Sequence, residues 1–250
     1  MLLRFLGTGS AFTPGRMFSS VLLNDRVLID PSPTSPVALK YLGIPTGAIH
    51  TVLVTHMHGD HFMGLPFLLL HWHYRDPPER SIEIYTPVGG EKAILKAAEL
   101  SYPNLIEKVD LKRIWRVREV SPGKKFTTGS GMKVEVFEMD HASIPAQGCL
   151  MELDGLTVGV TGDTDLCPGL EDMAERSDIL ITELSSWERD IPSHLSRSKL
   201  EALTPHLRGI KHLFLTHTED IPAQSVKEHL RLYIPGEVYV PNDLSTYVIE

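Results

Sequence analysis

Three histidines and an aspartate fall within six positions of the segment VLVTHMHGDHFMGLP. His56 and His58 are two residues apart, so in extended geometry their side chains leave the same face of the chain. Gly59 then permits a tight turn, after which Asp60 and His61 can point at a second position nearby. Two imidazoles for one cation, and a carboxylate with an imidazole for the next, suit first-row metal ions. The spacing therefore predicts part of a two-metal hydrolytic centre.

Two ligands for each ion leave both sites incomplete, so we expect further ligands downstream. Candidates stand at the ends of three later strand-like runs: His141 in FEMDHAS, Asp163 in GVTGDTD and His217 in LFLTHTED. Each of these side chains alone could equally serve to cap or hydrogen-bond a strand end. Together with the first motif they supply the missing ligands.

The candidate ligands each follow a segment that is typical of a strand, where loops on a rigid sheet can converge. HTVLVTH predicts a buried strand, and Pro66 begins a helix. A short helix in SPVALKYLG is expected to be capped by Ser35 and ended by Gly43. AQGCLMEL and LTVGV are strands around an Asp154-Gly155 turn, and EVYVPND is the closing strand. Strands followed by helices, twice over, favour two packed sheets with helices outside.

Composition narrows the class of protein. The chain of 250 residues has 42% hydrophobic and 22% charged residues, which is ordinary for a globular protein, and we expect one domain over residues 1–250. Its longest apolar run is far below the roughly 20 residues that span a bilayer, and its first residues are typical of a strand and a turn. The net charge of −8 is not that of a nucleic-acid-binding protein. Cys149 and Cys167 form no disulfide framework, which favours a cytoplasmic location.

The motifs resemble a known superfamily. HxHxDH after a strand, followed by a histidine, a GDT and a late TH, resembles the metallo-β-lactamase superfamily, and FLGTGSAFTPGRMFSSVLL is similar to its branch with ribonuclease Z and related phosphodiesterases. The resemblance covers nearly the whole chain. It implies an α+β fold, a four-layer αββα sandwich with the metals at one edge of the sheets.

The resemblance also implies how the ligands divide. One zinc ion would be held by His56, His58 and His141, the second by Asp60, His61 and His217, with Asp163 bridging the two. This division implies two metal ions per chain, and a histidine at position 58, where di-iron relatives have a glutamate, favours Zn²⁺ for both, with Mn²⁺ as the alternative. Asp30, which ends VLID, is either an acceptor for a ligand imidazole or a simple turn aspartate before Pro31.

ITELSS and PSHLSRSKLEAL are similar to segments that carry acid catalysis in the ribonuclease Z branch. The resemblance implies that Glu183 and His194 form an acid pair and that His194 protonates a departing alkoxide. Asp60 belongs with them at the catalytic centre. The alternative for His194 is an ordinary loop histidine after Pro192.

One departure bears on the substrate. Ribonuclease Z enzymes hold transfer RNA with a long arm between the counterparts of His141 and Asp163, and here the interval fits only two strands and a turn. Transfer RNA is therefore not expected as a partner. We expect a dinuclear phosphodiesterase of small or cyclic phosphate diesters; the alternatives are a ribonuclease Z-like endoribonuclease and an acyl hydrolase of lactones or thioesters. The resemblance also implies a homodimer.

Overall fold

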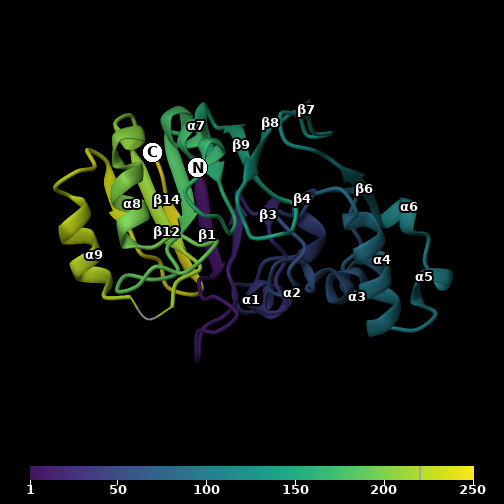
Figure 1. Ribbon diagram of the computed structural model, residues 1–250. Helices are drawn as coiled ribbons and strands as arrows, with labels where there is room; N and C mark the ends of the chain where they lie inside the picture. Colours follow the sequence, from purple (N-terminus) through teal and green to yellow (C-terminus); the bar gives the residue numbers. More distant parts are fainter. Residues whose placement is uncertain (220) are drawn as a thin grey trace.

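The computed structural model describes residues 1–219 and 221–250, and within these ranges the strands form two seven-stranded sheets (Figure 1). The first sheet has the order β14-β1-β2-β3-β4-β5-β6. Its strands are β14 (Ser245–Val248), β1 (Leu2–Gly7), β2 (Ser20–Leu23), β3 (Val27–Ile29), β4 (Thr51–Leu53), β5 (Ile82–Thr86) and β6 (Trp115–Glu119). The second has the order β13-β12-β11-β10-β9-β8-β7. Its strands are β13 (Glu237–Tyr239), β12 (His212–Thr216), β11 (Ile179–Glu183), β10 (Leu156–Val160), β9 (Ala146–Leu153), β8 (Lys133–Met139) and β7 (Lys125–Thr127).

Helices cover the outer face of each sheet. The first sheet is accompanied by α1 (Ser35–Tyr41), η1 (Thr46–Ala48), α2 (Gly59–Phe62), α3 (Leu65–Tyr74), α4 (Gly90–Ser101), α5 (Leu105–Lys108) and α6 (Leu111–Ile114). The second is accompanied by α7 (Pro168–Arg176), α8 (Arg197–Leu203), η2 (Thr204–Leu207) and α9 (Ala223–Leu230). The expected four-layer αββα sandwich of the α+β class is confirmed.

Alternating side chains build the layers. In β4, Leu53 packs in the core between the two sheets, whereas Val52, and Val54 directly after the strand, pack under the helices. In β1, Phe5 faces the core between the sheets and Leu6 the helices. Successive strand residues point to opposite faces, so sheets covered on both sides need apolar residues at nearly every position.

The strands that lead to the candidate ligands end at one edge. β3 to β6 are parallel to one another, as are β10 to β13. At this edge the two sheets are joined by backbone hydrogen bonds, from Gln147 N–H to Thr55 O (3.0 Å) and from Thr218 N–H to Thr8 O (2.9 Å). The loops after the strands of both sheets therefore meet.

Two expectations about local structure were wrong and one is confirmed. Ser35 does not cap α1: it is the first helical residue, and its hydroxyl bonds to that of Ser20 instead. EVYVPND contributes β13, but the chain continues into β14, which pairs antiparallel with β1. The expected turn lies between β9 and β10, where Asp154 and Gly155 adopt the left-handed φ values of 52° and 79°. Across the described ranges, no helix combines the length and apolarity that crossing a membrane requires.

Candidate metal centre

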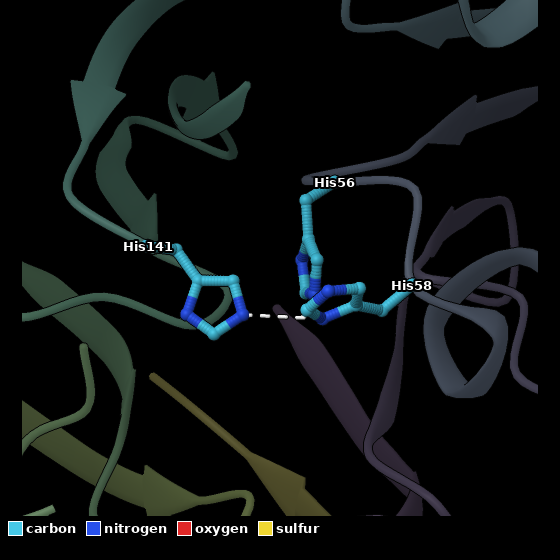
Figure 2. Close-up of side chains that lie close together, drawn as sticks. All are labelled: His56, His58 and His141. Carbon is cyan, nitrogen blue, oxygen red and sulfur yellow. Dashed lines mark hydrogen bonds between the residues drawn. The ribbon is translucent and has the colours of Figure 1, made fainter. Parts of the chain in front are cut away.

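Three of the predicted ligands form a first group, His56, His58 and His141 (Figure 2). His56 and His58 follow β4, and His141 follows β8. The Nδ1 atom of His58 and the Nε2 atom of His141 lie 3.1 Å apart. One nitrogen of each ring lies within 4.8 Å of one nitrogen of the other two. Two segments far apart in the chain thus turn their imidazoles toward one point.

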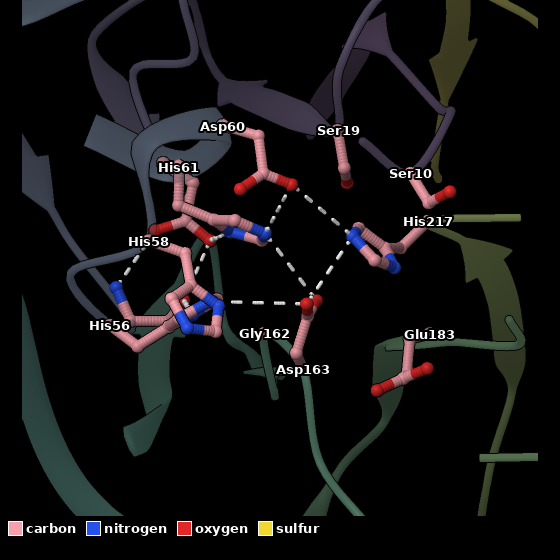
Figure 3. A network of polar contacts seen from close by, with 12 residues as sticks. Ser10, Ser19, His56, His58, Asp60, His61, Gly162, Asp163, Glu183 and His217 are labelled. Atoms are coloured by element: carbon pink, nitrogen blue, oxygen red, sulfur yellow. Dashed lines mark hydrogen bonds and ion pairs between the residues drawn. The ribbon is translucent and has the colours of Figure 1, made fainter. Parts of the chain in front are cut away.

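Asp60, His61 and His217 form a second group (Figure 3). Asp60 and His61 lie on the short helix α2, and His217 directly follows β12. The Oδ2 atom of Asp60 is 3.6 Å from Nε2 of His61 and 3.7 Å from Nε2 of His217. This group also draws on both sheets.

Asp163 lies between the two groups, in the loop after β10. Its carboxylate oxygens are 3.3 Å from Nε2 of His217 and 3.5 Å from Nε2 of His61. They are 3.9 Å from Nε2 of both His56 and His141. One buried carboxylate therefore faces histidines of both groups, which is the geometry expected of a bridge.

Four of the histidines have their Nδ1 atom held by the protein. These contacts join His61 to Asp30 (2.9 Å), His141 to the carbonyl of Ser193 (3.0 Å), His56 to the Thr55 hydroxyl (3.1 Å) and His217 to the Ser185 hydroxyl (3.2 Å). Such contacts orient metal-binding imidazoles. Asp30 therefore acts as the acceptor for an imidazole, and its other contacts are to the Thr55 amide and hydroxyl.

Four of the atoms that face the centre have no hydrogen-bond partner among the described residues. Within the described ranges, Nε2 of His56, His61 and His217 and Oδ1 of Asp163 are buried without a hydrogen bond. Buried polar atoms are rarely left in this state, since it costs free energy. Imidazole nitrogens and carboxylate oxygens are ligands that Zn²⁺ and Mn²⁺ accept. The residues present therefore fit divalent cations.

Charge at the centre is arranged around Asp163. Burial raises the pKa of Asp163, but the charges of His217 and His61 outweigh burial and bring it well below its ordinary value. Burial lowers the pKa of His61, whereas Asp163 and Asp30 raise it well above its ordinary value. The buried carboxylate and these two imidazoles thus stabilise each other's charged forms. A bound divalent cation would take the place of protons on the imidazoles, because metal ligands bind in their deprotonated form.

Glu183 and His194 form the expected pair beside the centre. His194 Nδ1 lies 2.9 Å from Oε1 of Glu183, which is fully buried at the end of β11. Burial lowers the pKa of His194, but the hydrogen bond to Glu183 and the charges of Glu183 and Asp163 together outweigh burial and raise it. Ser185, which sequence reasoning missed, connects this pair to the centre. Its hydroxyl donates to Glu183 (2.5 Å) and lies 3.2 Å from Nδ1 of His217.

A cleft of about 810 Å³ opens onto the centre and has the size of a small-molecule site. Its wall includes Asp163 and His194, and Phe12 is 83% exposed at its rim. Arg189 supplies the only Lys or Arg side chain among the described residues of the wall, and it lies 3.7 Å from Glu219.

The chain is similar in sequence and in fold to several known proteins. Zinc phosphodiesterase ELAC protein 1 of Homo sapiens is 37% identical over 109 residues, which cover 41% of this chain and 30% of the human protein. The match thus spans less than a third of that relative. Ribonuclease Z of Pyrobaculum arsenaticum is 24% identical over 98% of this chain and 97% of its own. The metallo-β-lactamase fold protein YhfI of Bacillus subtilis superposes with a TM-score of 0.76, at 18% identity and 98% coverage of both chains.

Fold and relatives together place the chain in the metallo-β-lactamase superfamily, with similarity to ribonuclease Z and zinc phosphodiesterases, as the motifs indicated. Within this superfamily the chain belongs to the family described as Anti-Pycsar protein Apyc1, whose model matches residues 1–234.

Proposed function

We propose that the chain is a dinuclear metal-dependent phosphodiesterase that hydrolyses small or cyclic phosphate diesters with two Zn²⁺ ions. The observation that carries the proposal is the set of four buried ligand atoms without hydrogen bonds in two groups that share one carboxylate. A single ion would leave part of this set without a partner. Mn²⁺ is the alternative metal for the same ligands.

The proposed ligand assignment follows the two groups. The first ion is held by His56, His58 and His141, the second by Asp60, His61 and His217, and Asp163 bridges them. Two divalent ions, when bound, activate water and stabilise negative charge on the attacked group. Asp60 belongs to the catalytic centre because its carboxylate lies beside both histidines of the second group.

His194 is the proposed general acid. Its Nδ1 is engaged by Glu183, so Nε2 is the atom that can donate a proton to the leaving alkoxide. The raised pKa of His194 favours the protonated form that this role requires. Glu183 orients the ring, because it also accepts hydrogen bonds from Ser185 and from the Thr164 amide (2.7 Å).

Charge and space support a diester over other substrates. A diester carries one negative charge, whereas a monoester dianion is usually held by arginine or lysine clusters. The cleft wall offers Arg189 alone in its described part, beside the opposing charge of Glu219. A small diester fits a cleft of about 810 Å³.

An endoribonuclease is the second candidate, because the relatives include proteins named ribonuclease Z. Against it, the interval between His141 and Asp163 is occupied by the β9–β10 hairpin, which leaves no arm for transfer RNA. Acyl hydrolysis of a lactone or thioester is the third, since the same metal chemistry suits acyl centres.

The test combines metal analysis with a substrate panel. We expect about two Zn²⁺ or Mn²⁺ ions per chain by elemental analysis of metal-loaded protein. Bis(p-nitrophenyl) phosphate should be cleaved faster than p-nitrophenyl phosphate, and faster than matched lactones and thioesters. One ion or fewer per chain would contradict the dinuclear centre, and a preference for the monoester or for an acyl substrate would contradict the phosphodiesterase.

We also propose a homodimer in the cytoplasm. The location is supported by two free cysteines, Cys149 and Cys167, since disulfides are rare in reducing compartments. Sedimentation equilibrium and cell fractionation test these two proposals.

A further inference from the structure

The loop of residues 190–196, called here the His194 loop, contributes two groups to the centre. It carries His194, and the carbonyl of its Ser193 accepts a hydrogen bond from Nδ1 of the proposed ligand His141 at 3.0 Å. Ser193 adopts a left-handed φ of 63°, which costs free energy for a residue other than glycine. Something outside the loop must therefore hold it in this conformation.

Lys199, on α8, reaches back to the loop. Its ammonium group donates to the carbonyls of Ile191 (3.1 Å) and His194 (2.9 Å) and to the carboxylate of Asp165 (2.8 Å). Three donors thus meet three acceptors, which uses the full capacity of a lysine. The side chain of Lys199 is only 20% exposed, so these contacts are largely shielded from water.

Asp165 anchors the other side of the contact. It lies two residues after the proposed bridge Asp163, and its own amide donates to Asp140 O at 2.7 Å. Its carboxylate also accepts the amide of Ser193 at 3.2 Å. The contacts of Lys199 and Asp165 therefore run from the loop after β10 to both ends of the strained segment.

We propose that Lys199, together with Asp165, is a positioning residue that clamps the His194 loop, so that His194 faces the leaving group while Ser193 fixes the ring of His141. This inference rests on the proposed function for its catalytic consequence. An arginine cannot replace the lysine fully, because its planar fork does not direct donors at three converging acceptors.

The first test measures the loop itself and needs no substrate. In Lys199→Met, amide hydrogen exchange in peptides covering residues 190–196 should rise by about tenfold or more, because charge-assisted hydrogen bonds are lost from the closed state. Peptides from β9 and β10 should be unchanged. Lys211→Met is the matched control, since Lys211 pairs with Asp178 (2.8 Å) at the opposite ends of the strands. Unchanged exchange in Lys199→Met, or an equal rise in the control, would overturn the clamp.

The second test measures catalysis and metal. Lys199→Met should lower kcat for an alkyl phosphate diester about tenfold more than for bis(p-nitrophenyl) phosphate, because only the alkoxide needs the proton. KM should change little, and zinc affinity should fall. For Lys199→Arg and Asp165→Asn, the difference in kcat loss between the two substrates and the loss of zinc affinity should both be intermediate. Equal losses on the two substrates would overturn the positioning role. A wild-type protein that cleaves no diester would refute the proposed function, while the exchange measurement still decides the clamp.

Discussion

At the proposed metal centre most imidazoles divide their two ring nitrogens between the protein and the centre. His61 gives Nδ1 to Asp30 and turns Nε2 toward Asp163, and His217 does the same with Ser185. This division fixes each ring in two directions, so little reorganisation is needed when a cation binds. Oδ1 of Asp163 is buried without any hydrogen bond to the described residues of the protein. Asp163 is therefore the side chain whose burial relies most on a bound cation.

Asp163→Ala should therefore abolish diester hydrolysis and lower the metal content to one ion per chain or fewer, because one carboxylate serves both groups. Elemental analysis and turnover of metal-loaded protein measure this. Asp178→Ala is the control, because the Asp178 carboxylate accepts a hydrogen bond from the Thr157 amide (2.8 Å) at the end of β10 that is remote from the centre. This variant should keep the metal content and the turnover of the wild-type protein. If Asp163 only caps a turn, its loss would cost about 1 kcal/mol and leave full occupancy and turnover.

His194→Ala should be most harmful where the leaving group is poor. A p-nitrophenolate leaves as a stable anion, whereas an alkoxide needs a proton in the transition state. General acid catalysis is worth about 10²–10⁴-fold, so kcat for an alkyl diester should fall within that range. For bis(p-nitrophenyl) phosphate the loss should be about tenfold or less by the same reasoning. Equal losses for both substrates would assign His194 to binding or structure.

Glu183→Gln gives a milder form of this effect and a pH signature. The hydrogen bond that His194 donates to Glu183 raises the pKa of His194 against the effect of burial. A group with a raised pKa stays protonated to higher pH, so activity on the alkyl diester should be present below that pKa and fall above it. The glutamine should move this fall to lower pH. Metal content should be unchanged in both variants.

Some residues of the site could be predicted from their spacing and others could not. HxHxDH places four potential ligands, three histidines and an aspartate, on one short segment, so local geometry alone indicates a metal site. Ser185 lies within ITELSS and Lys199 within PSHLSRSKLEAL, but serine and lysine are common on protein surfaces, so their types alone indicate no role. Their roles arise from contacts with His217 and Asp165, which are more than 30 residues away in the sequence. Only the folded chain brings these partners together.

Among the elements, strand ends position the side chains of the proposed centre, and at two strand ends the residue that does so has a strained backbone. Asp30 directly follows β3 with φ 48°, and His217 directly follows β12 with φ 51°. Left-handed conformations are uncommon outside glycine and cluster at functional sites. Here they turn a side chain toward the centre immediately after the strand ends.

Most helices and strands were predictable because the spacing of apolar residues within each short segment indicates its secondary structure. The last strand, β14, was missed, since it is short and pairs with β1 from the other end of the chain. Alternate residues of β14 are exposed, so no buried run marks it. Ser35 was wrongly expected to cap because its hydroxyl finds a partner in β2 rather than in its own helix. Both misses reflect long-range contacts.

Gly64→Ala tests how closely the junction between α2 and α3 must pack against the loop after β3 to hold the two proposed ligands on α2. A Cβ atom at Gly64 would lie 2.2 Å from Ser32 O and 2.6 Å from Pro31 O, both backbone atoms. The clash should cost about 1–3 kcal/mol of unfolding free energy and weaken metal binding through displacement of Asp60. Denaturant unfolding with chelator and a metal titration measure the two effects. Gly209→Ala, where the added Cβ meets nothing within 4 Å, should be neutral; equal effects would contradict the packing argument.

In the whole molecule, the proposed centre connects the two sheets. The first four proposed ligands follow β4 of the first sheet, and the other three follow β8, β10 and β12 of the second. Bound cations would therefore link the sheets at one edge, in addition to the core that the sheets share. β1 and β14 pair within the first sheet although they come from opposite ends of the chain. Both features support the expectation that residues 1–250 unfold as one unit.

The three tryptophans report on the two outer layers separately. Trp72 and Trp115 pack under the helices of the first sheet, and Trp187 packs under those of the second. Trp187→Phe leaves fluorescence from the first layer, and the double variant Trp72→Phe, Trp115→Phe leaves it from the second. In each variant we expect the fluorescence transition to coincide with that of circular dichroism, as for one cooperative unit.

Metal should then shift both transitions together, because its ligands come from both sheets. A ligand that binds only the folded state adds about 2.7 kcal/mol when its free concentration is 100 times Kd. For a chain of this size that corresponds to roughly 5–10 °C in Tm. Adding chelator should reverse the shift in both variants, and Asp163→Ala should reduce it in both. A shift confined to one layer would mean that metal binds within a single sheet, and separate transitions without metal would divide the chain into two domains.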